Sequence, residues 1–582
     1  MKLHRLRNRV RRVVHGRSLP TWYDARYRLP MATAESRLGI EPRRSDFALS
    51  YLLDSQVIRA EDVQRPSRIG YDDILRVHSR RLVESLHEPA TLSNVFGVHE
   101  DDVHVDEMLW TVRLACGGTL AASREALRRA GPTLNLLGGF HHAGTTRGAG
   151  LCPINDIAIA VAALRADGFD GQVNVLDLDA HPPDGTAECL RDDEKAHIGS
   201  LSGSDWGPIP DVDETVLPEG ASDGTYLVAL ADLLQRMPAA RLTFVIAGGD
   251  VLAGDRLGAL GLSLEGARRR DGMVAEAIEG ASVWLPGGGY NKRSWRVLAG
   301  TALAILGSEA TIPDGYDSIE SAFSRIRATL PSAALTGGED LALDDVLSDL
   351  GTVPRTERFL GFYTPSGIEH GLEQYGILGH LRRLGYRDFR VELAQPDERS
   401  RCRLYAKARG VEHLLMECVL ERRNVSGAPI LYVHWLTLRD GARELSARAL
   451  PGQERPGLGM AQEVNALMAQ IAMRLGLEGV GFSPSWCHMA CLARERAQFV
   501  DAERQGRLEA LARDLGHLPI RELSAAVEEE RVLMNGEPYA WEATDMVAWR
   551  DGPRLDEEQV ARERERVRFS LRDTDDAEAM KT

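Results

Sequence analysis

The chain has 582 residues, too many for a single hydrophobic core, so its length predicts at least two domains. Hydrophobic residues make up 43% of the chain and charged residues 27%, which is typical of globular proteins. The sequence contains no run of about 18 apolar residues, so it does not predict a membrane span. The net charge of −16 argues against a broad nucleic-acid-binding surface, because such surfaces are basic. Seven cysteines, an odd number in a long chain, favour reduced thiols and a cytoplasmic location.

Residues 1–310 are predicted to form an α/β domain that begins with a basic arm over 1–18, which lacks the apolar segment of a secretory signal. Buried strands are predicted at 133–139, 172–180, 242–250 and 282–290, with helices between them at 155–166, 223–236 and 264–279. Buried strands that alternate with helices indicate a parallel sheet covered on both faces. In such sheets, ligands bind beyond the carboxyl ends of the strands.

Residues 311–357 are rich in acidic residues, Gly, Ser and Pro, and predict an acidic linker region. Residues 358–550 predict a smaller α+β accessory domain of unknown role, and the charged residues 551–582 predict a frayed helix or a disordered tail. The elements expected in this domain are a helix at 367–384, strands at 388–394, 401–408, 412–423 and 429–438, a helix at 460–476, a short strand at 479–484, a helical region at 488–515 and a hairpin at Asn535-Gly536.

Charged side chains crowd the end of the predicted strand at 172–180. Asp177 and Asp179 point to the same face, because side chains alternate along a strand, and His181 follows them if the strand geometry persists. Together with Asp250, Asp179 and His181 would give three ligands and an open position, the arrangement of catalytic zinc sites. An ion-pair cluster at a strand end is the alternative interpretation.

Other polar residues at the strand ends would complete such a site. His141 and His142 follow a Gly-Gly turn and would supply a general base. Asp177 and Asp184 would then be the carboxylates that orient the imidazoles.

Four segments, taken in order, carry a resemblance to a known family. They read GGFHHAGTTRGAGLCPINDIAIA (138–160), VLDLDAHPPDGT (175–186), AGGDVLAGDRLGAL (247–260) and LPGGGYNKRS (285–294). They resemble the zinc-dependent histone deacetylase superfamily, whose core has the arginase-like α/β fold. The resemblance covers roughly 20–310, includes SRLGIEPRR and ILRVHSRRLVESL within 36–86, and is closer to class IV-like and bacterial members, here with an additional C-terminal domain.

The resemblance implies the metal sites. Asp179, His181 and Asp250 match the zinc ligands, and ferrous iron is the alternative metal. In relatives, backbone carbonyl groups of the metal strand also bind a structural potassium ion. The positions that match this potassium site are Asp177, Asp179, His181, Ser200 and Leu201.

The resemblance also implies the catalytic groups. His142 matches the imidazole that takes a proton from the metal-activated water, with Asp184 as its orienting carboxylate. His141 matches the neighbouring imidazole, backed by Asp177. Tyr290 matches the phenol that donates a hydrogen bond to the developing oxyanion, an interaction worth several kcal/mol of barrier.

Two departures from the family pattern affect this prediction. Pro182-Pro183 stand where the family usually has His-Gly, and proline fixes φ and lacks an N–H, so the loop must be rebuilt. Two outcomes are possible: the rebuilt loop keeps Asp184 in contact with His142, or it moves Asp184 out of reach. Gly150 and Leu151 match the tunnel wall, where many relatives have Phe in place of Leu151.

Three further features have simpler interpretations. Trp206 would either line the tunnel mouth or only pack against its neighbours. Cys152 is expected to be a buried small residue and not a nucleophile. Cys487, His488 and Cys491 lack a complete metal-ligand set, so helical packing is the preferred interpretation of 486–491.

The second domain resembles a GNAT-type acyltransferase in its order of sheet, glycine-containing loop (450–461), helix and strand. In that family the loop at the helix N-terminus holds a pyrophosphate. Glu454 stands where the family has Gln or Arg, and its charge would repel a phosphate. An accessory or oligomerisation domain is the preferred interpretation, and the oligomeric state is not predicted.

The sequence thus predicts a zinc-dependent amidohydrolase that removes an acyl group from an N-acyl-lysine in a protein or from a small acylated amine such as a polyamine. Class IV relatives favour long acyl chains, so a fatty-acyl substrate is included. Two alternatives remain open: a non-hydrolytic acyl-binding module with a disabled site, and a bifunctional deacylase–acyltransferase.

Overall fold

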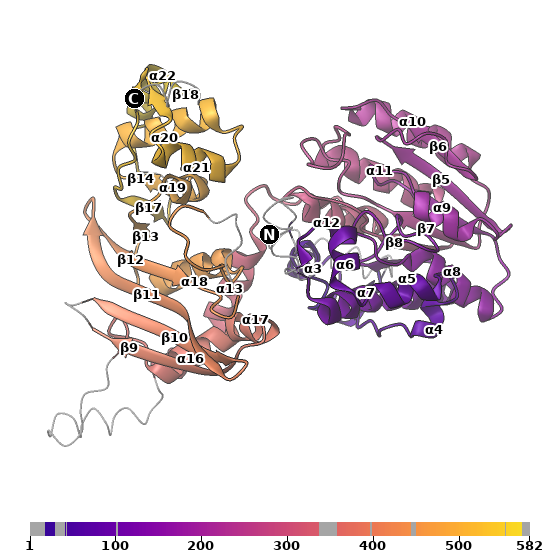
Figure 1. The fold of residues 1–582 in the computed structure, drawn as a ribbon, viewed down its shortest axis with the longest axis horizontal. Coiled ribbons are helices and arrows are strands. Elements are labelled where there is room, and N and C mark those ends of the chain that lie inside the picture. The colour runs from indigo at the N-terminus through magenta and orange to yellow at the C-terminus, as the bar shows by residue number, and fades with distance from the viewer. Residues whose placement is uncertain are drawn as a thin grey trace. The chain divides into compact units, whose positions relative to one another are not determined.

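The computed structural model describes residues 18–28, 41, 43–100, 103–336, 358–395, 399–443, 450–552 and 554–572. The chain divides into two compact units, Met1–Ser318 and Ile319–Thr582 (Figure 1). Within the described ranges, no helix is both long and apolar enough to cross a bilayer. All seven cysteines are described and are free thiols, as expected.

A parallel sheet forms the centre of the first unit, as predicted. In the described residues it has eight strands in the order β2-β1-β3-β8-β7-β4-β5-β6, and all its strand pairs are parallel. The strands are β1 (Thr21–Trp22), β2 (Val63–Gln64), β3 (Pro132–Asn135), β4 (Val173–Asp177), β5 (Ala196–Ser202), β6 (Val212–Val216), β7 (Leu242–Ile246) and β8 (Ala281–Leu285). The four predicted strands are present but shorter, because the last residues of each apolar run form loops.

Helices cover the two faces of this sheet (Figure 1). Because parallel crossovers are right-handed, the helices between β3 and β5 lie on one face, and those between β6 and β8 lie on the other. The helices of this unit are α3 (Arg44–Asp54), α4 (Tyr71–Ile74), α5 (Arg80–Ser85), α6 (Pro89–Phe96), α7 (Val105–Arg129), α8 (Asp156–Ala166), α9 (Asp184–Leu190), α10 (Asp223–Arg236), α11 (Leu264–Ala277) and α12 (Ser294–Ile305), with a 3-10 turn at Ala60–Asp62.

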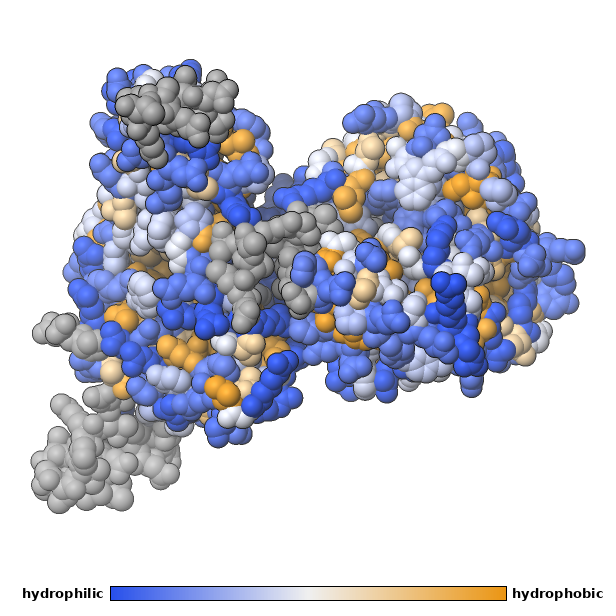
Figure 2. Space-filling model, in the orientation of Figure 1, coloured by the Kyte–Doolittle hydropathy of each residue, from blue (hydrophilic) through white to orange (hydrophobic). Residues whose placement is uncertain are grey.

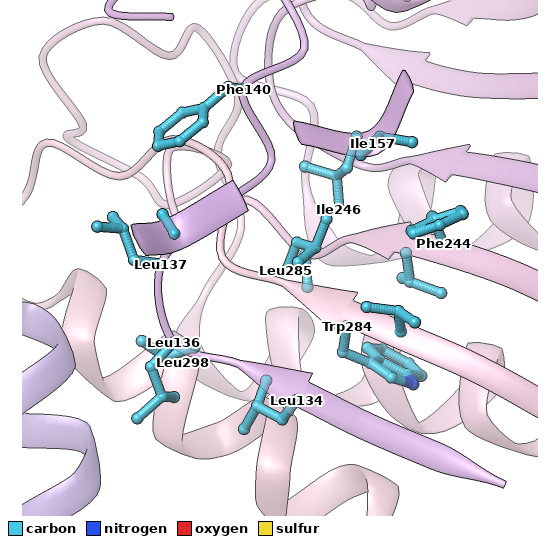
Figure 3. Close-up of a cluster of buried hydrophobic side chains, with 14 of the residues drawn as sticks. Leu134, Leu136, Leu137, Phe140, Ile157, Phe244, Ile246, Trp284, Leu285 and Leu298 are labelled. Atoms are coloured by element: carbon cyan, nitrogen blue, oxygen red, sulfur yellow. The ribbon is translucent and has the colours of Figure 1, made fainter. Parts of the chain in front are cut away.

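The hydrophobic core of the first unit surrounds the central strands. Figure 3 shows Leu134 of β3, Phe244 and Ile246 of β7, and Trp284 and Leu285 of β8 packed together, all of them buried. Burying side chains of this size stabilises a fold by roughly 1.5–3 kcal/mol each. The strands are therefore fixed in a packed platform, and the loops that leave their carboxyl ends start from well-defined positions.

The second unit is a separate α+β domain with a mixed sheet, also as predicted. Within the described residues this sheet has the order β14-β17-β13-β12-β11-β10-β9, in which only β12 and β13 pair in parallel. The strands are β9 (Arg387–Ala394), β10 (Ser400–Ala408), β11 (Val411–Val425), β12 (Ala428–Leu438), β13 (Gly479–Phe482), β14 (Gln498–Phe499) and β17 (Met546–Trp549).

A small sheet and several helices complete the second unit. The small sheet pairs β15 (Val532–Met534) with β16 (Glu537–Pro538) through the predicted hairpin at Asn535-Gly536, and with β18 (Phe569–Leu571). The helices are α13 (Ser318–Thr329), α14 (Ser332–Thr336), α16 (Pro365–Gln374), α17 (Ile377–Arg383), α18 (Ala461–Arg474), α19 (Cys487–Ala493), α20 (Ala502–Leu515), α21 (Ile520–Glu528) and α22 (Glu557–Arg566).

Three predicted segments differ from the structure. Residues 318–336, expected in the acidic linker, form α13 and α14, and the Arg327 side chain donates to Gln470 of α18. Residues 557–571, expected in a charged tail, form α22 and β18 because Val560 and Phe569 are buried. The predicted helix at 367–384 is broken at Gly376, whose φ of +76° is left-handed.

Parts of these segments lie outside the described residues: 1–17 of the basic arm, 337–357 of the linker and 573–582 of the tail. On the face that Figure 2 shows, hydrophilic residues predominate in both units and apolar residues are scattered among them. Scattered apolar residues are normal for a protein surface.

Candidate metal centre and active site

The predicted site residues lie on loops at one edge of the parallel sheet. His141 and His142 follow β3, Asp179 and His181 follow β4, Asp250 follows β7, and Tyr290 follows β8. These four strands are consecutive in the sheet, in the order β3-β8-β7-β4. Their carboxyl ends therefore converge, and the loops bring side chains together that are up to 149 positions apart in the sequence.

Asp179, His181 and Asp250 form a compact group at the centre of this edge. Each offers one ligand atom, and these atoms all lie within 4.8 Å of one another. His181 Nδ1 lies 3.1 Å from Asp179 Oδ1 and 3.1 Å from Asp250 Oδ2. Ligands at about 2.0 Å from a tetrahedral zinc lie about 3.3 Å from each other, so the three residues fit a zinc ion. They are the only such group of three that the described residues contain.

The surroundings of His181 support the same fit. Its Nε2 lies 3.1 Å from the carbonyl oxygen of Leu257, which can only accept a hydrogen bond, and this assigns the ring proton to Nε2. Burial alone would lower the pKa of His181, but its contacts with Asp179 and Asp250 raise it to about 11, so Nδ1 is protonated in the metal-free site and completes an ion pair. A divalent cation would take the place of this proton, and the Nδ1 lone pair would then bind it.

The two carboxylates are buried and are held by backbone groups. The exposed fractions of Asp179 and Asp250 are 1% and 0%. The backbone N–H of Gly288 donates to Asp179 Oδ2 at 2.5 Å, and that of Ala180 donates to Asp250 Oδ1 at 3.0 Å. A Cβ added to Gly248 would lie 2.8 Å from an oxygen of each carboxylate, so only glycine allows this close approach.

His141 and His142 lie side by side next to the acidic group, with ring centroids 4.0 Å apart and ring planes tilted by 41°. Each Nδ1 contacts its own carboxylate: His141 lies 2.8 Å from Asp177 Oδ2, and His142 lies 2.7 Å from Asp184 Oδ1. These contacts orient both rings, and the other ring nitrogen of His141, Nε2, lies 3.7 Å from Asp179 Oδ1.

The two histidines differ in charge. Burial alone would lower the pKa of His141, but the charges of Asp177 and Asp179 outweigh it and raise this pKa to about 9. Burial, and then the charge of His141, lower the pKa of His142 to about 4, although Asp184 opposes the change. His142 is therefore neutral near pH 7 and can accept a proton.

The Pro182-Pro183 loop keeps Asp184 in contact with His142. Pro183 has a φ of −83° and is the residue before α9, and Asp184 begins that helix. The second carboxylate oxygen of Asp184 accepts from Arg147 at 3.0 Å. The two prolines thus replace the usual residues without displacing the carboxylate.

The Tyr290 loop is held from two sides. The backbone N–H of Tyr290 donates to Asp255 Oδ2 at 2.8 Å. Arg44 of α3 donates to the carbonyl oxygens of Gly288 and Gly287, at 2.9 and 2.5 Å. Burial, with Asp179 and Asp250 nearby, raises the pKa of Tyr290 well above its ordinary value, so its hydroxyl remains a proton donor.

The residues expected to contact substrate lie around His142. Trp206 is 53% exposed and stacks on the His142 ring, with centroids 5.2 Å apart. Gly150 packs so closely on His142 that an added Cβ would lie 2.4 Å from its ring. Leu151 has a φ of +64°, an uncommon conformation for leucine that is held by the tight turn between Ala149 and Cys152. Burial raises the pKa of the Cys152 thiol well above its ordinary value, which fits a packing role.

Ser200 is the described residue that tests the potassium site. It pairs with Asp177 in the β4–β5 register, is fully buried, and its Oγ has no hydrogen-bond partner. A buried hydroxyl without a partner is rare, and a bound cation would supply the missing contact. The group of Asp177, Asp179, His181, Ser200 and Leu201 therefore fits a monovalent cation.

Several supporting residues were not predicted from the sequence. Arg44 and Asp255 hold the Tyr290 loop, and Asp156 accepts hydrogen bonds from the backbone N–H groups of Gly139 and Phe140, before the histidine pair. Asp156 and Arg44 lie inside segments that carried the family resemblance, which was the one available signal. In the second unit, Cys487 and Cys491 are buried with sulfurs 3.9 Å apart, and His488 contacts Ser524, which agrees with the packing interpretation.

Comparisons with known proteins agree on the first unit. Residues 39–306 match the histone deacetylase domain family. Histone deacetylase 2 of Arabidopsis thaliana is 28% identical over 296 residues, which cover 48% of this chain and 76% of that protein. An uncharacterized protein of Picosynechococcus is 36% identical over 189 residues, which cover 31% of this chain and 62% of that protein. A histone deacetylase homologue from Aquifex aeolicus, known from its crystal structure, is 24% identical in sequence to this chain. The match covers 51% of this chain and 86% of that protein's chain, with a TM-score of 0.45.

Proposed function

We propose that this chain, whose residues 39–306 belong to the histone deacetylase family, is a zinc-dependent amidohydrolase that removes an acyl group from an amine. The observation that carries the proposal is the convergence of three ligand residues, two carboxylate-backed histidines and a buried tyrosine at one sheet edge. The expected products are an acyl acid and a free amine.

The ligand group is proposed to hold the metal. Zinc bound by Asp179, His181 and Asp250 would polarise the amide carbonyl and lower the pKa of a nearby water. The same residues also suit ferrous iron, and metal analysis of the purified protein distinguishes the two. Potassium at the Ser200 site would partly balance the charge of Asp177 and Asp179.

His142 is proposed as the general base. It is neutral near pH 7, and Asp184 holds the proton on Nδ1, so Nε2 can accept a proton from the attacking water. The resulting imidazolium is stabilised by Asp184 and can then pass the proton to the departing amine. His141, whose pKa is about 9, is positively charged in the metal-free site and would donate a hydrogen bond to the reacting oxygens.

Tyr290 is proposed as the donor to the carbonyl oxygen. Its hydroxyl stays protonated, and its loop is fixed by Asp255 and Arg44, so the donor is held in place before the reaction. A pre-positioned donor stabilises the negative charge that develops on this oxygen without reorganisation during the reaction.

The proposed substrate is an N-acyl-lysine in a protein or a small acylated amine. Leu151 and Trp206 would contact the aliphatic stem of the amine, because Trp206 stacks on His142 and Leu151 follows Gly150, which packs on the same ring. Among the relatives, Arabidopsis histone deacetylase 2 carries this activity in its name. Because the chain spans less than two thirds of the Picosynechococcus relative, the activity of the whole protein remains a proposal.

One alternative is a binding module in which the Pro-Pro loop has disabled the base. That alternative requires Asp184 to be out of reach of His142. The 2.7 Å contact between them favours the hydrolytic proposal.

A second candidate function concerns the second unit. Its parallel strands β12 and β13 pair only from Leu431 to Val433, whereas β12 continues to Leu438. Helix α18 begins close by in sequence, after the glycine-containing loop, with Met460 directly before its first residue. These features favour an acyltransferase-like unit that binds an acyl-coenzyme A. Glu454 counts against this function, because its charge would repel a phosphate of the coenzyme. Calorimetric titration of the full chain with acetyl-coenzyme A tests this, and no binding would contradict it.

Hydrolysis of acyl-lysine peptides, from acetyl to myristoyl, by the zinc-loaded protein tests the main proposal. Turnover should fall by about 10²–10³-fold in Tyr290→Phe, which loses the donor. Tyr51→Phe is the matched control, because the hydroxyl of this buried tyrosine donates a hydrogen bond to the Thr311 carbonyl oxygen, outside the site. No hydrolysis of any acyl-lysine or acylated polyamine by zinc-loaded protein would contradict the proposal.

A further inference from the structure

A fully buried arginine lies beside the metal-ligand group and takes no part in the reaction proposed above. Arg270 of α11 has an exposed fraction of 0%. Its Nη1 donates to two backbone carbonyl oxygens, those of Leu178 at 3.2 Å and Gly248 at 2.8 Å. Its Nε donates to Asp271 Oδ1 at 2.8 Å. One guanidinium therefore joins a helix to two separate strand ends.

Both carbonyl groups belong to the segments that carry the ligands. Leu178 directly precedes Asp179, and Gly248 lies two residues before Asp250. The ladder between β4 and β7 ends at Asp177 and Ile246, and the Leu178 N–H donates to the Ile246 carbonyl oxygen just beyond it. Arg270 thus connects the two segments at the point where the sheet no longer does.

The position of Gly248 sets how closely the two carboxylates approach. Gly248 packs against both, since an added Cβ would lie 2.8 Å from Asp179 Oδ2 and from Asp250 Oδ1. A shift of the Gly248 backbone relative to Leu178 would therefore change the separation of the two ligand side chains. The hydrogen bonds from Arg270 oppose such a shift.

Asp271, the acidic partner in the ion pair, holds the Arg270 side chain in place. Asp271 is also fully buried, and its other oxygen accepts from Thr301 Oγ1 of α12 at 2.6 Å. Burying an ion pair is unfavourable unless its geometry is good, and well-packed apolar residues in its place often stabilise a fold at least equally. Fold stability alone therefore does not explain why a guanidinium with two backbone carbonyl partners occupies this place.

We propose that Arg270 is a positioning residue that holds Asp179 and Asp250 at the separation that the metal ion requires. The proposal rests on the metal-dependent function proposed above. It concerns the affinity for zinc and not the chemical step, so it can be tested without a substrate.

The decisive variant removes both charges. Arg270→Met together with Asp271→Leu leaves no unpaired buried charge, so the fold is expected to stay intact. Residues that support metal ligands typically change metal affinity by about 10–100-fold, so the double variant should bind Zn²⁺ more weakly by that factor. Arg270→Lys keeps the charge but lacks the planar fork, and an intermediate affinity is expected. Competition with a chelator measures the affinity, and the unfolding temperature reports stability.

Arg165 provides a matched control in the same unit. It also pairs with an aspartate, Asp193, and donates to three backbone carbonyl oxygens, those of Phe169, Gly171 and Lys195. These partners lie before β4, at the opposite end of the strand from the ligands. Arg165→Met should lower the unfolding temperature and leave the zinc affinity unchanged.

The outcomes separate the two proposals. A double variant that binds zinc as tightly as the wild type would overturn the role of Arg270 and leave the proposed function intact. A wild-type protein that binds no zinc would contradict both. Weaker zinc binding in the double variant, with Arg165→Met unchanged, supports the role of Arg270 even if no acyl substrate is hydrolysed.

Discussion

The parallel sheet of the first unit buries charge at its carboxyl edge, whereas the mixed sheet of the second unit carries its charges on exposed strand faces. Asp177, Asp179 and Asp250 are at most 1% exposed. In the second unit, the paired side chains of Arg390 and Glu392 are 49% and 43% exposed, and the buried carboxylate Asp440 after β12 stands alone and accepts a hydrogen bond from Tyr386.

This contrast identifies the functional region on physical grounds. A buried carboxylate costs several kcal/mol unless partners compensate for its lost hydration, so three together require a cation or a chemical role. Exposed ion pairs carry no such requirement, because water solvates each partner. The same residue types therefore mark a site in the first unit and an ordinary solvated face in the second.

Replacement of the proposed base should give the largest effect. In His142→Ala, no imidazole remains to accept the proton from water, so kcat for the best acyl-lysine peptide should fall by about 10²–10⁴-fold. Zinc content should stay the same, since His142 is not in the ligand group. His78→Ala is a control for loss of a buried histidine, because His78 contacts the Gly144 carbonyl and the Asn155 N–H outside the catalytic group. A His142→Ala variant as active as His78→Ala would contradict the assignment.

A smaller effect is expected when the carboxylate behind this base is neutralised. Asp184→Asn keeps the shape but no longer stabilises the charged imidazole, and a loss of about 10–100-fold in kcat is expected. The same change at Asp193, which is paired with Arg165 away from the site, should leave kcat unchanged. Equal activity of Asp184→Asn and the wild type would mean that the Pro-Pro loop has made this contact dispensable.

The smallest effect is expected on the exposed face of the second unit. Arg403 lies 2.8 Å from Glu417, but its side chain remains 30% exposed. Arg403→Gln should therefore change the free energy of unfolding by less than about 1 kcal/mol, measured by urea denaturation. A change of several kcal/mol would contradict the view that charge in this sheet is only a solvated surface feature.

The sequence predicted the parts of the fold and the site that depend on local pattern. The strands that carry Asp179, Asp250 and Tyr290 are continuous apolar runs, and their polar ends predicted the edge where the structure brings these residues together. Strands β5 and β6 were not predicted, because their residues, such as His197 and Asp213, interrupt the apolar pattern. Helix α13 was missed for a related reason, since it buries only a narrow apolar stripe within a polar sequence, whereas α22 lies where a frayed helix or a disordered tail was expected.

The supporting residues could not be predicted because they depend on contacts between distant segments. Arg44 reaches the Tyr290 loop across more than 240 residues, and Arg270 reaches Leu178 across 92. Neither position has a local pattern that separates it from the other arginines. The fate of the Pro182-Pro183 loop was likewise open, because local rules restrict the backbone angles of prolines but do not fix where Asp184 lies.

The central claim is that the buried carboxylates of the first unit form a metal-dependent hydrolytic site. Its most direct test is the rate of acyl-lysine hydrolysis before chelation of the metal, after chelation, and after addition of one equivalent of Zn²⁺. We expect chelation to abolish hydrolysis, and one equivalent of zinc to restore it in the wild type but not in Asp250→Ala. Hydrolysis that continues at full rate in the metal-free protein would contradict the account.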